Sequence, residues 1–411
     1  MKELSTRMRG RSVLLGLILG TCGLTAGHTQ VSLPQKQLVP TNYPPGAARP
    51  GFGETVSILG GRALVAQVSG GVVSVFEQSG GKWTNTQQIQ TPLWDIERGK
   101  GMGDVIVQDA NSILTSDVHY GYVYYFERGP TSGLFKPKAI LRSSTFNQFG
   151  TALAMEGCKL MASAMNVYPG TPWPGRIHLY NRCSGSVAWT GTIYSPKGVD
   201  SHDEFGRSIA LSGNELMVGA PYDSSAAGAV YYYTYNGSAW VLKQTILQPF
   251  GGVGYRFGTA LSFRNGLAVI GAPGQSDVGR TEVFKRTSAG TWQWVSSLVQ
   301  PSYDGTTWGF GTKVIVTPDR VLVGTEYVPL VPGFNSTLYL FKRVGDTLQY
   351  ELQLKADPSH APAPNRVPSG YASSFDVAGR SLIVGEPEIP QRPGNPETPG
   401  TGEATVLQLP P

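Results

Sequence analysis

Few residues in this 411-residue chain have the types and spacing that catalysis requires. The one polar run with acid–base potential is His202-Asp203-Glu204, and Asp223 follows it in the next loop. Such a group could supply a general acid and a general base to a hydrolase or lyase. A solvated turn is the simpler interpretation of the run, so we assign no catalytic residue.

The remaining histidines do not form a metal site. His119, His178 and His360 lie in separate parts of the chain, and none forms a pair at helical spacing. His178 lies in a segment that predicts a strand, so we interpret it as structural. The glycine-rich stretches are interpreted as hairpin turns, because none follows a strand and opens a helix as a phosphate-binding loop does. We expect neither a metal nor another cofactor.

The elements that would position these residues belong to a repeat. Its openings recur every 47 to 61 residues, at Phe52-Gly53, Met102-Gly103, Phe149-Gly150, Phe205-Gly206, Phe257-Gly258, Phe310-Gly311 and Tyr371-Ala372. The clearest unit predicts four short strands, at 208–211, 216–219, 228–233 and 240–246. A period near 50 residues with four strands is typical of a propeller blade.

The last repeat ends at Pro411 after only three predicted strands. Fourth strands elsewhere end in a polar–apolar–Pro pattern, as in 87–92 and 243–249, and 35–40 has the same pattern. We therefore predict an all-β, seven-bladed propeller of four-stranded antiparallel blades, in which the N-terminal segment closes the ring as the outer strand of blade seven. Six or eight blades are alternatives, but the repeat count favours seven. A single domain then spans 28–411, with the closing strand and linker at 28–50.

Several of these motifs resemble the FG-GAP repeat family, the integrin-α-like propellers, in a secreted bacterial form. The resemblance rests on the Phe-Gly openings and on the Gly-Ala-Pro steps at 219–221 and 271–273. It implies a propeller fold and, for many members, calcium loops between the first two strands of a blade. Here those connections are short, as at Gly60-Gly61 and Gly157-Cys158, and lack the acidic cluster that calcium needs. We expect no structural metal and blades held by packing alone.

The first 27 residues have the pattern of a secretory signal peptide. A basic start precedes the short apolar run 13–20, and small residues follow at 25–27. The run is short for a membrane span, and we expect no transmembrane segment. Removal of residues 1–27 is one outcome, and a lipid anchor on Cys22 is the alternative. Either outcome predicts a secreted, cell-surface or periplasmic protein.

The formal net charge of +5 gives no indication of a nucleic-acid partner. Four cations and one acid of the signal segment account for +3 of it, which leaves about +2 on the rest. Lysine and arginine form no run or stripe there, so we expect no binding of nucleic acid.

Cys158 and Cys183 remain once Cys22 is set aside. In the third repeat they occupy the turns between strands one and two and between strands three and four, which alternating strand directions place on the same face. An oxidising compartment favours a disulfide between them. Two free thiols are the alternative, because neighbouring turns need not have the required Cα spacing.

The two faces of the predicted disc differ in the connections they carry. The hairpin face, which holds those turns, has short glycine-rich connections such as 79–81 and 236–238. The loop-rich face receives the connections between strands two and three and those between blades. Its aromatic residues are our candidates for ligand binding, although each could instead pack over a blade end. They are Trp94, Tyr168, Trp173, Tyr222, Tyr255, Tyr303, Trp308 and Tyr327.

These observations favour an exported, non-enzymatic propeller that binds a protein or carbohydrate through its loop-rich face. A hydrolase or lyase on a propeller scaffold is the first alternative, and close approach of Asp203, Glu204 and Asp223 would favour it. A structural component of an envelope or matrix is the second alternative.

Overall fold

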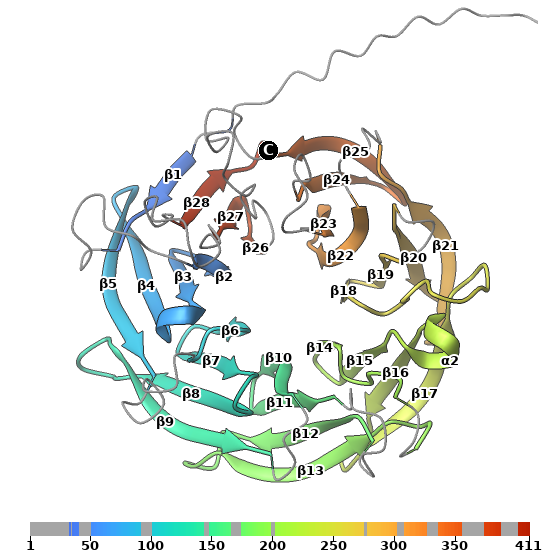
Figure 1. Cartoon of the computed structure of the whole chain (residues 1–411), viewed down its shortest axis with the longest axis horizontal. Coiled ribbons are helices and arrows are strands. Elements are labelled where there is room, and N and C mark those ends of the chain that lie inside the picture. Colours follow the sequence, from blue (N-terminus) through green and yellow to red (C-terminus); the bar gives the residue numbers. More distant parts are fainter. Residues whose placement is uncertain are drawn as a thin grey trace, which may run out of the picture. The chain divides into compact units, whose positions relative to one another are not determined.

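The computed structural model describes residue 33 and the ranges 35–40, 51–91, 101–143, 148–165, 174–198, 202–274, 278–301, 308–326, 336–355, 374–387 and 402–411. Within these residues the strands form seven four-stranded antiparallel sheets arranged as a ring (Figure 1). The predicted all-β, seven-bladed propeller is therefore confirmed.

Each blade runs outward from an inner first strand to an outer fourth strand (Figure 1). Blades one to three comprise β2 (Phe52–Leu59), β3 (Arg62–Gln67), β4 (Val72–Ser79) and β5 (Lys82–Gln90); β6 (Ile106–Gln108), β7 (Ser112–Asp117), β8 (Tyr122–Arg128) and β9 (Phe135–Arg142); and β10 (Phe149–Glu156), β11 (Lys159–Ala164), β12 (Arg176–Asn181) and β13 (Ala188–Tyr194). Blades four and five comprise β14 (Ser208–Ser212), β15 (Glu215–Ala220), β16 (Ala229–Tyr235) and β17 (Trp240–Leu247); and β18 (Leu261–Arg264), β19 (Leu267–Ala272), β20 (Arg280–Arg286) and β21 (Trp292–Leu298). Blades six and seven comprise β22 (Trp308–Val316), β23 (Arg320–Glu326), β24 (Leu338–Val344) and β25 (Thr347–Leu354); and β26 (Ser374–Ala378), β27 (Ser381–Glu386), β28 (Glu403–Gln408) and β1 (Gln35–Leu38). The short helical turns η1 (Val68–Gly70) and α2 (Asp223–Ala226) lie in connections between second and third strands.

The ring closes as the sequence predicts. β1 pairs antiparallel with β28, with Lys36 opposite Val406 and Leu38 opposite Ala404. Leu38 is buried in a cluster with Phe52 of blade one and Val406 of blade seven. The N-terminal strand therefore completes blade seven and contributes to its boundary with blade one.

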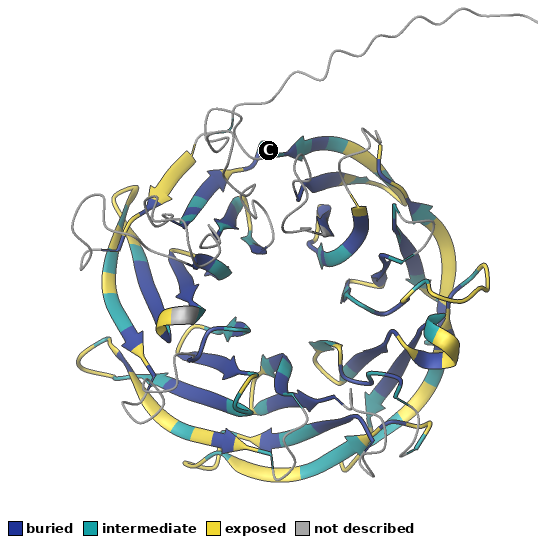
Figure 2. Cartoon of the chain, in the orientation of Figure 1, coloured by how far each residue is buried: buried dark blue, intermediate teal, exposed yellow. Residues whose placement is uncertain are grey.

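The hydrophobic core is divided into seven clusters among the described residues, one at each boundary between neighbouring blades. The phenylalanines that open the repeats are almost fully buried there, as expected for residues packed between blades; they are Phe52, Phe149, Phe205, Phe257 and Phe310. Figure 2 shows dark, buried second and third strands and long exposed stretches on the outer strands. Burial of apolar side chains between neighbouring blades therefore supplies most of the packing.

The Phe-Gly step turns the chain into each blade, at a place too crowded for a side chain on the glycine. Gly258 has a φ of 94°, and its N–H donates to the Gly271 carbonyl at 3.0 Å. A Cβ atom on Gly258 would lie 2.8 Å from the Ala229 carbonyl oxygen. Only glycine meets both the dihedral and the steric requirement.

The main differences from the predicted elements concern strand ends. The third strand of blade four continues from the predicted end at residue 233 to Tyr235, and in blade one the third strand runs past the buried Phe76 to Ser79, which pairs with Lys82 across the hairpin. Polar residues near the rim keep their backbone pairing although their side chains are exposed, so hydrophobic periodicity alone places the end too early.

Candidate functional site

Asp203 is a buried brace beneath the loop-rich face of blade four. Its carboxylate accepts a hydrogen bond of 2.5 Å from the Ser195 hydroxyl and one of 3.0 Å from the Phe205 N–H. Its carbonyl accepts the Tyr222 N–H at 3.1 Å. Asp203 is only 1% exposed, so the expected solvated turn is wrong at this residue. Burial is tolerated because both carboxylate oxygens have donors.

Asp223 braces the next loop in the same way. Its carboxylate accepts the Tyr231 hydroxyl at 2.5 Å and the Ser224 hydroxyl at 2.6 Å, and the Lys197 ammonium lies 3.3 Å away. Burial, followed by the hydrogen bond to Asp223 and the charge of Asp203, raises the pKa of Tyr231 far above its usual value. The two carboxylates therefore belong to one cluster around Tyr231.

Glu204 is the third acid of that run. Its backbone is left-handed, with a φ of 53°, and its carboxylate lies 3.6 Å from the Arg207 guanidinium. Burial raises the pKa of Glu204, and the positive charges of Arg207 and Arg256 oppose that rise. With Asp203 and Asp223 both engaged by donors, the cluster is arranged to hold loops, and Glu204 is its one carboxylate near the surface.

Strained backbone is concentrated at this place. Eight non-glycine residues in the described ranges have a positive φ, and six of them lie in the loops around blade four and its connection to blade five. These six are His202, Glu204, Ser224, Ser225, Ala226 and Arg256. Each such residue costs about 1–3 kcal/mol and persists only where its surroundings fix it, which is common at functional sites.

Hydrogen bonds between the two loops fix that backbone. The Gly254 N–H donates to the Ser225 carbonyl at 3.2 Å, and the Arg256 N–H donates to the Ala226 carbonyl at 2.8 Å. The Arg256 guanidinium lies over the Tyr222 ring, 5.7 Å from its centroid. The loop after β15 and the connection after β17 therefore form one preordered surface, which we call the blade-four surface (residues 202–207, 222–227 and 250–256).

The predicted aromatic residues fall into three groups. Tyr222 and Tyr255 lie on the blade-four surface, and Tyr222 is 40% exposed. Trp308 is exposed but is the first residue of β22, opposite Glu326, rather than part of a loop, because its backbone continues the pairing of blade six. The other five lie outside the described residues: Trp94, Tyr168, Trp173, Tyr303 and Tyr327.

Sequence reasoning missed three residues at the edge of this surface. Phe250 is exposed and packs edge to face on Trp294, with ring centroids 5.4 Å apart. The Arg280 guanidinium lies 5.4 Å from the centroid of Phe250. The run Phe250-Gly251-Gly252 after a strand-ending proline was a usable signal, because an aromatic residue beside two glycines has no strand to bury it.

The opposite, hairpin face is tied together by polar contacts. Every boundary between neighbouring blades carries at least one, and several use a cation that reaches the next blade: Arg62 to Ala110, Arg182 to Asp109, Lys159 to Gly213, Arg286 to Glu215, Lys285 to Asp346 and Arg320 to Pro410. The boundary between blades seven and one is bridged by Asp376, which accepts the Ile58 N–H at 2.9 Å. Packing is therefore supplemented by a polar belt that the sequence-based expectation lacked.

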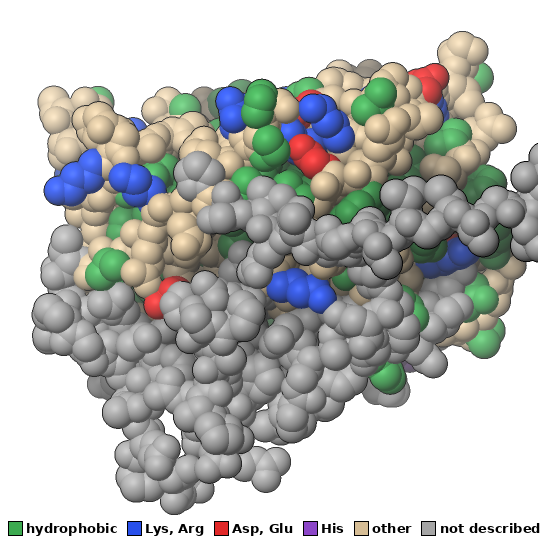
Figure 3. Space-filling model, turned by 90° about the horizontal axis from the view of Figure 1, so that it is seen from above, with side chains coloured by type: hydrophobic (Ala, Val, Ile, Leu, Met, Phe, Trp, Pro, Cys, Tyr) green, Lys and Arg blue, Asp and Glu red, His purple; other side chains and the backbone are tan. Residues whose placement is uncertain are grey.

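Charge elsewhere is dispersed. Figure 3 shows one edge of the molecule, where the lysine and arginine side chains that can be seen occur singly or in small groups separated by uncharged surface. The described side chains visible on that edge form no continuous basic stripe.

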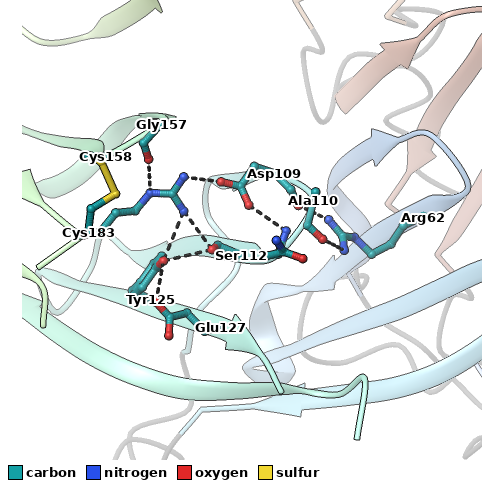
Figure 4. A network of polar contacts seen from close by, with 11 residues as sticks. Arg62, Asp109, Ala110, Ser112, Tyr125, Glu127, Gly157, Cys158 and Cys183 are labelled. Atoms are coloured by element: carbon teal, nitrogen blue, oxygen red, sulfur yellow. Dashed lines mark hydrogen bonds and ion pairs between the residues drawn. A yellow bond between two sulfur atoms is a disulfide. The ribbon is translucent and has the colours of Figure 1, made fainter. Parts of the chain in front are cut away.

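The disulfide belongs to the polar belt of the hairpin face. Cys158 and Cys183 are bonded, with Cα atoms 5.1 Å apart, as predicted. Arg182, next to Cys183, donates to the Gly157 carbonyl at 2.7 Å, to the Ser112 hydroxyl at 2.9 Å and to Asp109 (Figure 4). The bond therefore joins the two turns from which Arg182 reaches blade two.

The family comparison agrees with the geometry. The model of the FG-GAP repeat matches residues 195–233, which hold the start of blade four and the Asp203 and Asp223 braces. The chain is an FG-GAP repeat β-propeller. In this FG-GAP propeller the matched segment includes both the Phe205-Gly206 opening and the Gly-Ala-Pro step that leads to Tyr222.

Solved structures similar to this FG-GAP propeller share its fold at low identity. A functionally unknown protein from Desulfotomaculum acetoxidans is 15% identical, with a TM-score of 0.50, over 85% of this chain and 100% of that one. A Lactobacillus plantarum protein is 11% identical, with a TM-score of 0.50, over 74% and 84%. Saccharomyces cerevisiae Sqt1 is 14% identical, with a TM-score of 0.49, over 86% and 82%. No curated protein sequence matches the chain.

The described residues contain neither a candidate metal site nor a candidate membrane-spanning helix. In the described ranges no three His, Cys, Asp or Glu side chains are grouped so that they could hold a metal ion. Likewise, no helix among the described residues has the length and apolar character to cross a membrane.

Proposed function

We propose that this FG-GAP propeller is an exported, non-enzymatic binding protein whose blade-four surface recognises a macromolecular partner. The observation that carries the proposal is the concentration of left-handed, mutually hydrogen-bonded residues in the loops that hold Tyr222 and Arg256. Strain of this kind is retained where a fixed shape is useful, and a preordered surface loses little entropy on binding.

The composition of the surface suits recognition. Tyrosine, tryptophan and arginine are the residues that most often dominate binding energy at interfaces. Tyr222 and Arg256 present two such groups on loops, with the exposed Phe250 in the same connection as Arg256, whereas the hairpin face uses its cations to join blades. The division of labour between the faces supports binding through the loop-rich face.

Binding is favoured over hydrolysis by the state of the carboxylates. A general acid or base must lie within hydrogen-bond distance of the substrate atom to which it gives, or from which it takes, a proton. Asp203 and Asp223 are buried, and their oxygens already accept hydrogen bonds from Ser195, Phe205, Tyr231 and Ser224. Export is supported by the N-terminal signal pattern and by the disulfide, which forms in oxidising compartments.

The test is a glycan and protein array probed with the purified chain lacking residues 1–27, together with hydrolase and lyase assays. We expect the array to identify ligands. Tyr222→Ala should weaken the affinity for them by at least about tenfold, which corresponds to roughly 1.4 kcal/mol. Trp189→Ala is the matched control, because Trp189 is an exposed aromatic residue on the outer strand of blade three. Turnover in the assays with no array ligand would support the enzymatic alternative. If the chain shows neither binding nor turnover, the result would support a structural role.

A further inference from the structure

A second exposed feature overlaps the edge of the blade-four surface. The rim patch consists of Phe250, Trp294 and Arg280, which contact one another through Phe250, and of the exposed residues Leu247, Val253 and Val299, which lie on or next to the outer strands of blades four and five. Phe250 and Val253 are 52% and 70% exposed. Exposed apolar side chains of this size on neighbouring elements mark a surface that binds another molecule.

Two arginines of this region have uncommitted guanidinium groups. Within the described residues, the Arg280 guanidinium has only its stacking on Phe250, and Arg256 has its stacking on Tyr222 and a longer-range interaction with Glu204. Neither side chain forms a hydrogen bond or ion pair with another residue of the described ranges. By contrast, Arg62, Arg182 and Arg320 on the hairpin face donate to oxygen atoms of a neighbouring blade.

The nearby acids do not satisfy these arginines. Glu282, two residues from Arg280 on β20, is buried and accepts the Trp294 indole N–H at 2.8 Å and the Ser297 hydroxyl at 2.6 Å. Glu204 lies closest to Arg207. Glu282 is therefore held inside and Glu204 is paired with Arg207, so the outward-facing charges left for a partner in this described region are those of Arg256 and Arg280.

From this we infer that the rim patch, with Arg256 and Arg280, docks a protein segment that presents carboxylates beside large apolar side chains. The arginine fork matches a carboxylate in two hydrogen bonds, and its stacking on an aromatic ring keeps it in place. The aliphatic residues Leu247, Val253 and Val299 favour a peptide over a sugar, because they offer apolar contact without a flat ring or polar groups for hydroxyls. The inference rests on the proposed binding function and names its partner class.

The test uses fluorescence polarisation with short synthetic linear peptides on the chain lacking residues 1–27. One set places Asp or Glu at varied spacings from Leu, Phe or Trp, and a matched set replaces the acids by Asn and Gln. We expect acidic peptides to bind at least about tenfold more tightly than their amide counterparts. Arg280→Gln should remove most of that difference, and Phe250→Ser should weaken both sets.

Arg264→Gln is the matched control, since Arg264 is an exposed arginine at the hairpin end of β18 in blade five. Equal binding of acidic and amide peptides, or an acid preference unchanged in Arg280→Gln, would overturn the inference. Tighter binding of polygalacturonate through the same residues would overturn the choice of a protein partner. If no peptide binds but an array ligand depends on Tyr222, the proposed function stands and this inference fails.

Discussion

A Cβ atom on Gly271 would lie 1.8 Å from the carbonyl oxygen of Gly311. Gly271 lies near the end of β19 in blade five, and Gly311 belongs to the Phe-Gly step that opens blade six. The same relation joins Gly219 to Gly258 at 2.1 Å and Gly385 to Gly53 at 2.0 Å. At these three boundaries adjacent blades therefore interlock backbone to backbone, and a side chain in place of the second-strand glycine would hold them apart.

Gly271→Ala should destabilise the ring by at least about 3 kcal/mol, because the atoms in the way are backbone and cannot rotate aside. Gly61→Ala is the control, since a Cβ atom there would make only ordinary contacts at 3.7 Å and beyond. Urea unfolding measures both free energies. Equal stability of the two variants would mean that the blades are not interlocked as described.

Arg320 is the buried member of the hairpin-face belt. Its guanidinium donates two hydrogen bonds to Glu351, of 2.8 and 2.9 Å, and one of 2.8 Å to the Pro410 carbonyl. Arg320→Ala should cost about 3–5 kcal/mol, because it leaves a carboxylate without its partner in a partly buried place. Arg286→Ala removes the more exposed pair with Glu215 and should cost at most about 1 kcal/mol. Chemical denaturation of both variants compares the two costs, and a smaller loss for Arg320→Ala would contradict this ranking.

The disulfide should stabilise the protein by constraining the unfolded chain. Cys158 and Cys183 are separated by 25 residues. Closing a loop of that size contributes about 3 kcal/mol in the chain-entropy model. We expect Cys158→Ser/Cys183→Ser to lower the free energy of unfolding by that amount and to be insensitive to reductant. A wild-type protein equally stable with and without dithiothreitol would argue against this contribution.

His178 should make stability depend on pH. Burial, followed by the charge of Arg176, lowers the pKa of His178 from 6.5 to about 4. The unfolded chain therefore takes up a proton at a higher pH than the folded protein does. Stability is fully present above pH 6.5 and is lost as pH falls toward 4, by up to about 3 kcal/mol.

His178→Phe keeps a ring beside Phe149, whose centroid lies 5.3 Å away, and removes the titrating group. The difference in unfolding free energy between pH 7 and pH 4 should be smaller in this variant than in the wild type. An unchanged difference would assign the acid sensitivity to other groups.

The ring could be predicted from sequence because its signals are local. The pattern at 35–40 sufficed to predict the pairing of β1 with β28, since a fourth strand carries its alternation and its terminal proline with it. The disulfide followed from the same alternation of strand directions.

The candidate site depends on contacts between distant segments and could be predicted only in part. Tyr222 was found because exposed loop aromatics are visible in sequence, but its stacking with Arg256 joins two connections. The burial of Asp203 requires the Ser195 hydroxyl from the preceding blade. The left-handed backbone at Ser225 and Ala226 is not indicated by a glycine in the sequence, because hydrogen bonds from Gly254 and Arg256 of the neighbouring loop hold it.

The most direct test of the binding surface blocks one face at a time. The chain lacking residues 1–27 has two cysteines, both in the disulfide, so Ser225→Cys and Ser238→Cys each add a single reactive thiol, on the blade-four surface and on the hairpin face, and both variants keep Tyr222. Each variant is coupled to a bulky maleimide polymer, and its affinity for the array ligand is measured before and after coupling. Our account predicts that the polymer at position 225 abolishes binding while the polymer at position 238 leaves it unchanged; the reverse pattern would contradict it.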